Sequence, residues 1–217
     1  MKKLVIFDLD GTLLDTIDDL GEAANYALRT LGFPERKREE YYLLAGRGIT
    51  NLLKGALPAG HDTEETVSLI RNHFLAHYNV HLCDKTHPYP GIPRLLERIS
   101  AAGVRVAVAS NKFQTGAETV VRHFFPAIPF VTILGQREGY PIKPDPGIVD
   151  LCMKAAGVTK EDVLYVGDTN VDMQTGLNAG VDTAGVTWGF RSRQELEECR
   201  PQAVVETPAQ LEAMILD

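Results

Sequence analysis

The alternation of apolar and polar positions predicts a sheet of short strands connected by helices. The first apolar run stops abruptly at Asp8, which is typical of a buried strand. Strands are predicted on the same grounds at residues 3–8, 104–109, 130–134, 163–166, 181–187 and 203–205. Helical patterns separate and follow the later strands, at 92–102, 114–123, 146–156, 170–179, 193–199 and from Pro208 onward. Strands that alternate with helices favour a parallel sheet covered on both faces, so we predict an α/β, Rossmann-like core.

Residues 15–83 follow a helical pattern instead. Apolar residues recur at helical spacing from Ile17 to Leu31, and no convincing strand follows within the block. Helices are predicted at 17–31, 36–45, 48–56 and 62–80. The first strand precedes this block, and the other strands follow a linker rich in proline. We therefore predict a core formed by residues 1–14 and 84–217, interrupted by an all-helical insert at 15–83.

Polar residues cluster where the predicted strands end. These segments are Asp8-Leu9-Asp10, Ser110-Asn111-Lys112, Ile142-Lys143-Pro144 and Gly167-Asp168 through Asp172. Because ligands bind at the carboxyl ends of parallel strands, we expect the segments to converge on one volume. Clustered carboxylates repel one another unless a hard cation holds them, and oxygen ligands suit Mg²⁺. The carboxylates expected around this Mg²⁺ site are those of Asp8, Asp10, Asp168 and Asp172.

The same residues could carry out phosphoryl transfer. The carboxylate of Asp8 can attack phosphorus, and Asp10 can serve as a general acid and later as a base. Ser110 and Lys143 offer a hydroxyl and a positive charge for phosphoryl oxygens. Aspartate and serine also cap helices and fill turns, which explains any one of the segments equally well. The four segments together, in this order, favour the catalytic interpretation.

The four segments resemble the motifs of the haloacid dehalogenase-like superfamily, and the resemblance spans nearly the whole chain. It implies that Asp8 is the nucleophile and Asp10 the general acid/base. It also implies that Mg²⁺ is held by Asp8, the carbonyl of Asp10 and Asp168, with Asp172 steadying the metal site. The residues implied to bind the phosphoryl group are Ser110, Asn111 and Lys143. The helical insert is similar to the family's helical cap, which closes over the substrate and excludes water.

Two further stretches, Tyr89–Pro93 and Gly185–Phe190, resemble the phosphoglycolate phosphatase-like branch. We therefore expect a small phosphorylated metabolite as substrate, with 2-phosphoglycolate as the first candidate. The branch also contains pyrophosphatases and nucleotidases, and these alternatives stay open. In the cap, Arg47 stands between two glycines and could reach a second acidic group of the substrate. An arginine that simply faces solvent explains this position equally well.

Other activities associated with an acceptor aspartate fit the sequence less well. A dehalogenase lacks the second aspartate because no phosphate oxygen needs a proton, so Asp10 favours phosphoryl transfer. The family's phosphosugar mutases typically carry a histidine shortly after the first motif, and residues 15–20 contain none. A receiver-like module, which accepts a phosphoryl group for signalling without being an enzyme, would be shorter and uncapped. Its acceptor would also lie on a middle strand of the sequence.

Composition narrows the location and the partners. Hydrophobic residues make up 44% of the chain and charged residues 24%, which is typical of a globular protein. No apolar run can span a membrane or form a signal-peptide core, so we expect a cytoplasmic protein. The three cysteines, Cys83, Cys152 and Cys199, form no metal pattern and indicate a reducing compartment. A net charge of −7 disfavours nucleic acid and membranes as partners, and the oligomeric state stays open.

Two weaker signals have plain interpretations. His73, His77 and His81 lie on one face of a predicted helix, as a zinc site would require. No carboxylate completes a known helical zinc pattern there, so a mixed surface explains them better. Asp18 and Asp19 stand at the start of a predicted helix, and we interpret them as solvated charges that favour the helix dipole.

Overall fold

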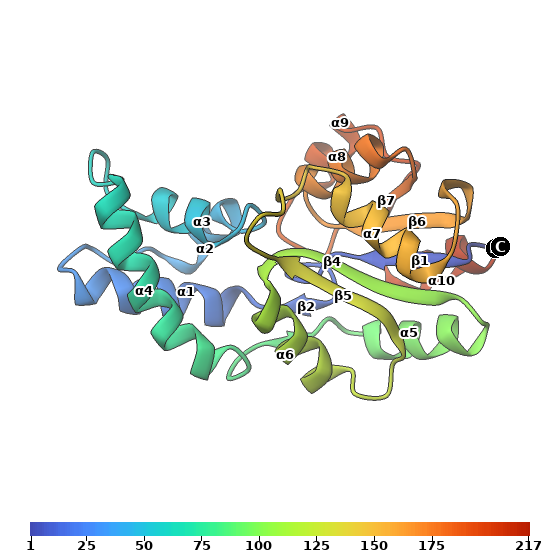
Figure 1. The fold of residues 1–217 in the computed structure, drawn as a ribbon, viewed down its shortest axis with the longest axis horizontal. Helices are drawn as coiled ribbons and strands as arrows, with labels where there is room; N and C mark the ends of the chain where they lie inside the picture. Colours follow the sequence, from blue (N-terminus) through green and yellow to red (C-terminus); the bar gives the residue numbers. More distant parts are fainter.

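The computed structural model describes residues 1–217 and contains a parallel sheet of six strands (Figure 1). The strands are β1 (Leu4–Phe7), β4 (Arg105–Phe113), β5 (Phe130–Gln136), β6 (Val163–Gly167), β7 (Asp182–Val186) and β8 (Ala203–Val205). Their order across the sheet is β5-β4-β1-β6-β7-β8. Strand β1 therefore lies between β4 and β6, where the chain changes from one side of the sheet to the other. In open parallel sheets this switch point is where ligands bind.

Helices cover both faces of the sheet. They are α5 (Ile92–Ala101), α6 (Gln114–Phe124), α7 (Gly147–Ala156), α8 (Asn170–Ala179), α9 (Arg193–Glu198) and α10 (Pro208–Leu216), with a 3₁₀ turn at Lys160–Asp162. Val5 and Phe7 of β1 belong to a buried cluster that includes residues of α5, α6 and α10. Leu4 and Ile6 belong to a second cluster with residues of α7 and α8. Because both faces are buried, β1 is apolar at every position, which explains the unbroken run in the sequence.

Four more helices form a group beside the sheet (Figure 1). They are α1 (Ile17–Thr30), α2 (Arg38–Leu44), α3 (Ile49–Ala56) and α4 (Glu64–His81). Helix α4 packs against α1 and α3, and the cluster that contains Val5 and Phe7 continues into this group. The group lies within residues 15–83, and we propose this segment as a cap domain.

A small antiparallel ribbon joins the cap to the core. It pairs β2 (Leu14–Asp15), at the exit from the core, with β3 (His87–Pro88), at the return. The sequence predicts only linkers here, because two residues are too few to show the periodicity of a strand. The ribbon brings the two linkers together, so the cap is attached at one place.

The carboxylate of Asp19 reinforces this junction. It accepts hydrogen bonds from the backbone N–H groups of Lys85 at 3.0 Å and Thr86 at 2.8 Å, and from the Thr86 hydroxyl at 2.7 Å. The side chain is buried. The interpretation of Asp19 as a solvated charge is therefore wrong, because its oxygens bind backbone donors of the return linker. Asp18 remains partly exposed and pairs with Arg38.

Strand β4 is longer than predicted. It continues past residue 109 to Phe113, with a register shift between Ala109 and Phe113. Ser110, Asn111 and Lys112 therefore lie in an irregular stretch of the strand rather than after its end. An irregular stretch of this kind can aim side chains away from the regular alternation.

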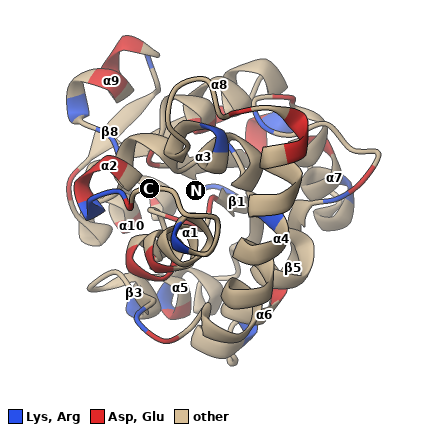
Figure 2. Cartoon of the chain, turned by 90° about the vertical axis from the view of Figure 1, so that its left-hand side faces the viewer, with Lys and Arg blue, Asp and Glu red and all other residues tan.

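The surface carries charges of both signs. Figure 2 shows Lys and Arg interspersed with Asp and Glu over the cap helices and the visible core helices. None of the helices combines the length and the apolar character that crossing a membrane requires. The three cysteines are all unpaired. His77 contacts the rings of Tyr26, on α1, and His81, on α4. His77 therefore takes part in an aromatic contact between these two helices.

Candidate active site

Asp8 and Asp10 are placed by the turn that follows β1. The carbonyl of Leu9 accepts hydrogen bonds from the backbone N–H groups of residues 12–14, which bends the chain sharply. Gly11 allows this bend with a φ of +88°. A Cβ atom at Gly11 would lie 2.3 Å from Oδ2 of Asp168. Glycine is therefore required twice at this position, for its conformation and for the close approach of Asp168.

Three buried carboxylates meet at the ends of β1 and β6. Oxygens of Asp8, Asp168 and Asp172 all lie within 4.8 Å of one another. Lys143, from the loop between β5 and α7, places its Nζ 2.8 Å from Asp8 Oδ1 and 2.6 Å from Asp172 Oδ1. The structure therefore brings together four residues from distant parts of the sequence, as the convergence of strand ends predicts.

Neighbouring donors fix the orientation of the two later aspartates. Asp168 accepts hydrogen bonds from the Thr12 hydroxyl at 2.7 Å and from the backbone N–H of Phe190 at 2.8 Å. Asp172 accepts from the hydroxyl and the backbone N–H of Thr169, which caps helix α8. Asp172 therefore also serves as a capping residue. Its Oδ2 bonds to Thr169 at the start of the helix, and its Oδ1 pairs with Lys143.

Asp8 Oδ1 is buried without a hydrogen bond although a cation is adjacent. The three hydrogens of the Lys143 ammonium have other acceptors nearby, namely Asp172 Oδ1, the Ala109 carbonyl and the Tyr165 hydroxyl. Lys143 therefore acts on Asp8 mainly through its charge, 2.8 Å away. The oxygen keeps its lone pairs, as a metal ligand or a nucleophile requires.

The cluster carries three carboxylates against one ammonium. The pKa of Asp8 is raised to about 7, chiefly by burial and then by Asp172, while Lys143 acts in the opposite direction. Burial also raises the pKa of Asp168, with added repulsion from Asp172 and Asp8. Burial lowers the pKa of Lys143, but Asp172 and Asp8 outweigh that effect and raise it overall. A divalent cation among these oxygens would offset the excess negative charge, and oxygen-only ligands suit Mg²⁺.

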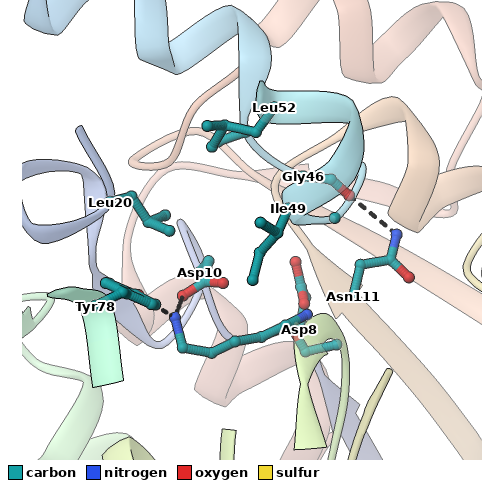
Figure 3. Close-up of a pocket in the computed structure, with 12 residues that line it drawn as sticks. Asp8, Asp10, Leu20, Gly46, Ile49, Leu52, Tyr78 and Asn111 are labelled. Carbon is teal, nitrogen blue, oxygen red and sulfur yellow. Dashed lines mark hydrogen bonds and ion pairs between the residues drawn. The ribbon is translucent and has the colours of Figure 1, made fainter. Parts of the chain in front are cut away.

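Asp10 is partly buried and belongs to a second group of polar side chains. Lys112 Nζ lies 3.0 Å from Asp10 Oδ1 and also donates a hydrogen bond to the hydroxyl of Tyr78, on cap helix α4 (Figure 3). Burial lowers the pKa of Lys112, but Asp10 and Tyr78 raise it overall. The sequence analysis assigns no role to Lys112 or Tyr78. The adjacency of Lys112 to Ser110 and Asn111 is the one sequence signal that points to it.

Ser110 and Asn111 occupy the irregular stretch of β4. Ser110 lies beside the carboxylates in the lining of a cavity, and its Oγ accepts from the backbone N–H of Lys112 at 3.2 Å. The Asn111 side chain bonds to backbone atoms of Lys143 and to the carbonyl of Gly46 in the cap, at 3.1 Å (Figure 3). Asn111 thus holds the lysine loop and the cap loop, and its contact with phosphate stays a prediction.

Comparison with known proteins agrees with this arrangement. The sequence model of the family described as haloacid dehalogenase-like hydrolase matches residues 5–186, a span that contains the residues of both groups. The chain belongs to this family. A phosphoglycolate phosphatase from Aquifex aeolicus is 33% identical over 188 residues, which cover 87% of this chain and 86% of the relative. One from Haemophilus influenzae is 32% identical and covers 96% of each chain.

A solved structure extends the likeness to the whole fold. A proposed phosphoglycolate phosphatase from Lactobacillus delbrueckii subsp. bulgaricus superposes with a TM-score of 0.92 at 32% identity. The match covers 100% of this chain and 99% of that one. The hydrolase therefore belongs to the phosphoglycolate phosphatase-like branch of the family, and it is a phosphoric monoester hydrolase.

A small cavity lies between the proposed cap of this hydrolase and the core, over Asp8 and Asp10. The cavity volume is about 30 Å³, which holds water but not a whole phosphomonoester in this conformation. The lining residues from the cap are Leu20, Ala45, Gly46, Gly48, Ile49, Leu52 and Tyr78. Those from the core are Asp8, Asp10, Ser110, Asn111 and Lys112. A substrate enters such a space only when the cap moves aside.

Arg47 lies outside this cavity. Both of its glycine neighbours line the cavity, but the arginine is exposed and lines a separate hollow with Asn51 and Pro144. Arg47 therefore does not line the cavity beside the carboxylates, although its hollow also contains Lys143. Successive residues of the turn face opposite sides, and the sequence pattern does not reveal which side each one takes. The role of Arg47 in substrate choice stays a prediction.

Proposed function

We propose that this hydrolase is a Mg²⁺-dependent phosphatase that acts on a small phosphomonoester, with 2-phosphoglycolate as the first candidate, through an aspartyl-phosphate on Asp8. The observation that carries the proposal is the buried Asp8 Oδ1, which has no hydrogen bond and lies 2.8 Å from the Lys143 ammonium. Such an oxygen is oriented and poorly solvated, which suits nucleophilic attack on phosphorus.

In the proposed first half of the reaction, Asp8 is the nucleophile and Asp10 the general acid. Asp8 Oδ1 attacks phosphorus, the bond from phosphorus to the ester oxygen breaks, and a phosphoryl–Asp8 bond forms. Asp10 gives its proton to the departing oxygen as a general acid. The Lys143 charge and the Ser110 hydroxyl stabilise the phosphoryl oxygens. Asp172 holds Lys143 in place at 2.6 Å.

The second half returns the enzyme to its starting state. Asp10, now a carboxylate, takes a proton from water, and the water oxygen attacks phosphorus. The bond between phosphorus and Asp8 breaks and inorganic phosphate leaves. The carboxylates of Asp8, Asp168 and Asp172, with the Asp10 carbonyl, are the groups that would hold Mg²⁺. When bound, the cation neutralises charge on the transferring group.

The choice of substrate is supported by the relatives and by the size of the cavity. The relatives described above are phosphoglycolate phosphatases. The space over Asp8 and Asp10 is small in this conformation, so a short leaving group needs less displacement of the cap than a large one. A nucleoside is much larger, so the closed cap disfavours a nucleotidase. Pyrophosphate is small enough to be included among the substrates to test.

The proposal is tested by phosphate release from a panel of esters. The panel contains 2-phosphoglycolate, p-nitrophenyl phosphate, pyrophosphate and a nucleoside monophosphate, each with Mg²⁺ and with a chelator. We expect the highest kcat/KM for 2-phosphoglycolate and loss of activity with the chelator.

Asp8→Asn should lower kcat by roughly 10³-fold or more while the circular dichroism spectrum is unchanged. Activity at the wild-type level in Asp8→Asn, or in the chelator, would contradict the mechanism. One phosphate bound per chain without turnover would indicate a receiver-like module.

A further inference from the structure

The cavity has a phosphate end and a leaving-group end. Asp8 and Ser110 lie at the phosphate end, next to the carboxylate cluster. The other end is walled by Leu20, Ile49, Leu52 and Tyr78 (Figure 3). Lys112 also lines the cavity and lies beside Tyr78. The leaving group of an ester attached at Asp8 is enclosed by these side chains when the cap closes. The polar groups among them therefore decide which leaving groups are accepted.

Lys112 is the only lysine or arginine in the lining of the cavity. Its side chain is 2% exposed, and its Nζ donates to Asp10 Oδ1 and to the Tyr78 hydroxyl. An ammonium group has three donors, so one has no partner in the protein. The Tyr78 hydroxyl accepts from Lys112, and its own proton also has no acceptor in the protein. Two donors therefore remain for a molecule in the cavity.

Donors at this position match an anionic leaving group. The lining also contains the carboxylates of Asp8 and Asp10, so a second negative group of a substrate is stable there only beside a cation. The apolar walls cannot solvate a carboxylate, which makes its hydrogen bonds to protein donors decisive. In a short acidic ester the carboxylate is only a few bonds from the ester oxygen that Asp10 protonates. Lys112 contacts Asp10 directly, so it lies within the reach of that carboxylate.

The other lysine and arginine side chains near the site bind other groups or face away from the cavity. Lys143 donates to Asp172, Ala109 and Tyr165. Arg191 donates to backbone carbonyls of the cap. Arg47 is exposed and faces a separate hollow. The absence of another available cation and the position of Lys112 therefore both indicate Lys112.

We propose that Lys112, assisted by the hydroxyl of Tyr78, binds the carboxylate of the leaving group and selects short acidic alcohol phosphates over neutral ones. The inference rests on the proposed function and assigns recognition of the acid to Lys112 instead of Arg47. Tyr78 belongs to cap helix α4, whereas Lys112 belongs to the core. The recognition site is therefore complete only when the cap is closed. Binding of an acidic leaving group would thus stabilise the closed cap.

The test compares one acidic ester with one neutral ester of similar size. We measure kcat/KM for 2-phosphoglycolate and for ethyl phosphate, with saturating Mg²⁺. Lys112→Met should lower the value for 2-phosphoglycolate about 100-fold more than for ethyl phosphate, the effect of removing one partner from a buried charge pair. Tyr78→Phe, which keeps the cation, should cost the acidic ester about 10-fold more than the neutral one.

Tyr41→Phe is the matched control. It removes the hydroxyl of another buried tyrosine of the cap, one that donates to Asn25 at 2.6 Å and does not line the cavity. The ratio of the two kcat/KM values should not change in this variant. If Lys112→Met does not fold, the comparison between Tyr78→Phe and Tyr41→Phe decides the question alone.

The outcomes separate the inference from the proposed function. Equal losses for both esters in Lys112→Met would show that Lys112 acts only through Asp10, and would overturn the inference alone. Loss of the preference in Arg47→Ala, but not in Lys112→Met, would overturn it in favour of Arg47. A wild-type preference for ethyl phosphate would overturn both the inference and the substrate assignment. Absence of activity toward either ester would overturn the proposed function itself.

Discussion

Asp8, the proposed nucleophile, illustrates how the surroundings of a side chain can hold it in an unfavourable state. It is buried beside Asp168 and Asp172, and a single ammonium faces the three carboxylates. Its pKa is raised from the ordinary 3.8 to about 7, first by burial and then by Asp172. The folded chain therefore binds the Asp8 proton more tightly than the unfolded chain does. Near neutral pH and without metal, the ionised form of this residue opposes folding.

Asp8→Asn should therefore stabilise the metal-free protein, and the gain should depend on pH. A raised pKa means that stability is full below about pH 4 and is lost as the pH rises through about 7. Asparagine does not ionise and avoids this loss. The free energy of unfolding of the variant, measured with urea, should exceed that of the wild type by roughly 1–3 kcal/mol at pH 8 and by little at pH 4. A difference that does not change with pH would show that Asp8 is not destabilised by its charge.

Saturating Mg²⁺ provides the control for this measurement. A cation near Asp8 favours the ionised form and binds the folded state alone. Mg²⁺ should then raise the free energy of unfolding of the wild type more than that of Asp8→Asn at pH 8. The difference between the two proteins should become smaller or change sign. The same experiment therefore reports on the metal site without any measurement of turnover.

At the scale of elements, the sequence predicts regular structure well and its junctions poorly. Helix α8 and strand β8 have the predicted bounds, because a glycine or a proline marks their ends and apolar residues their faces. The ribbon of β2 and β3 is not predicted, since two residues carry no periodicity. The burial of Asp19 is not predicted either, because its partners, the N–H groups of Lys85 and Thr86, lie far along the chain.

Asp19→Asn should destabilise the protein by about 2–3 kcal/mol, because it replaces a charged acceptor of several buried hydrogen bonds. The amide group of asparagine would also place donors against the backbone N–H groups of Lys85 and Thr86. Asp18→Asn is the neighbouring control, and its partly exposed pair with Arg38 should contribute less than about 1 kcal/mol. Urea unfolding followed by circular dichroism gives both values. Similar effects of the two substitutions would show that Asp19 does not hold the junction.

At the scale of the whole molecule, parallel topology explains why the convergence of the site residues could be predicted from the sequence. Asp8, Lys143 and Asp168 follow strands of one sheet, so their convergence needs no knowledge of side-chain packing. The contacts between cap and core could not be predicted in this way. Lys112 meets Tyr78 only because helix α4 crosses the end of β4 in the folded chain. Arg47 shows the same limit, since the direction of a side chain in a turn depends on the tertiary structure.

Arg191 makes the most extensive of these contacts between cap and core. Its guanidinium donates to the carbonyls of Leu43 at 3.1 Å and Ala45 at 3.0 Å, and also to that of Tyr42. These carbonyls end helix α2, where a positive charge is favoured by the helix dipole. Ala45 itself and Gly46, which follows it, line the cavity. We infer that Arg191 holds this part of the cap in the closed position.

Arg191→Lys should loosen the closed cap, because a lysine ammonium cannot reproduce the planar array of donors that meets the carbonyls. Amide hydrogen exchange in residues 42–48 should become about 10- to 100-fold faster, while exchange in β1 stays unchanged. The kcat/KM values for 2-phosphoglycolate and ethyl phosphate should fall by the same factor, unlike the selective loss expected for Lys112→Met. Arg193→Lys, at an exposed arginine paired with Glu197 and Glu206, serves as the control. Unchanged exchange in the cap segment of Arg191→Lys would show that closure depends on other contacts, such as the bond from Asn111 to Gly46.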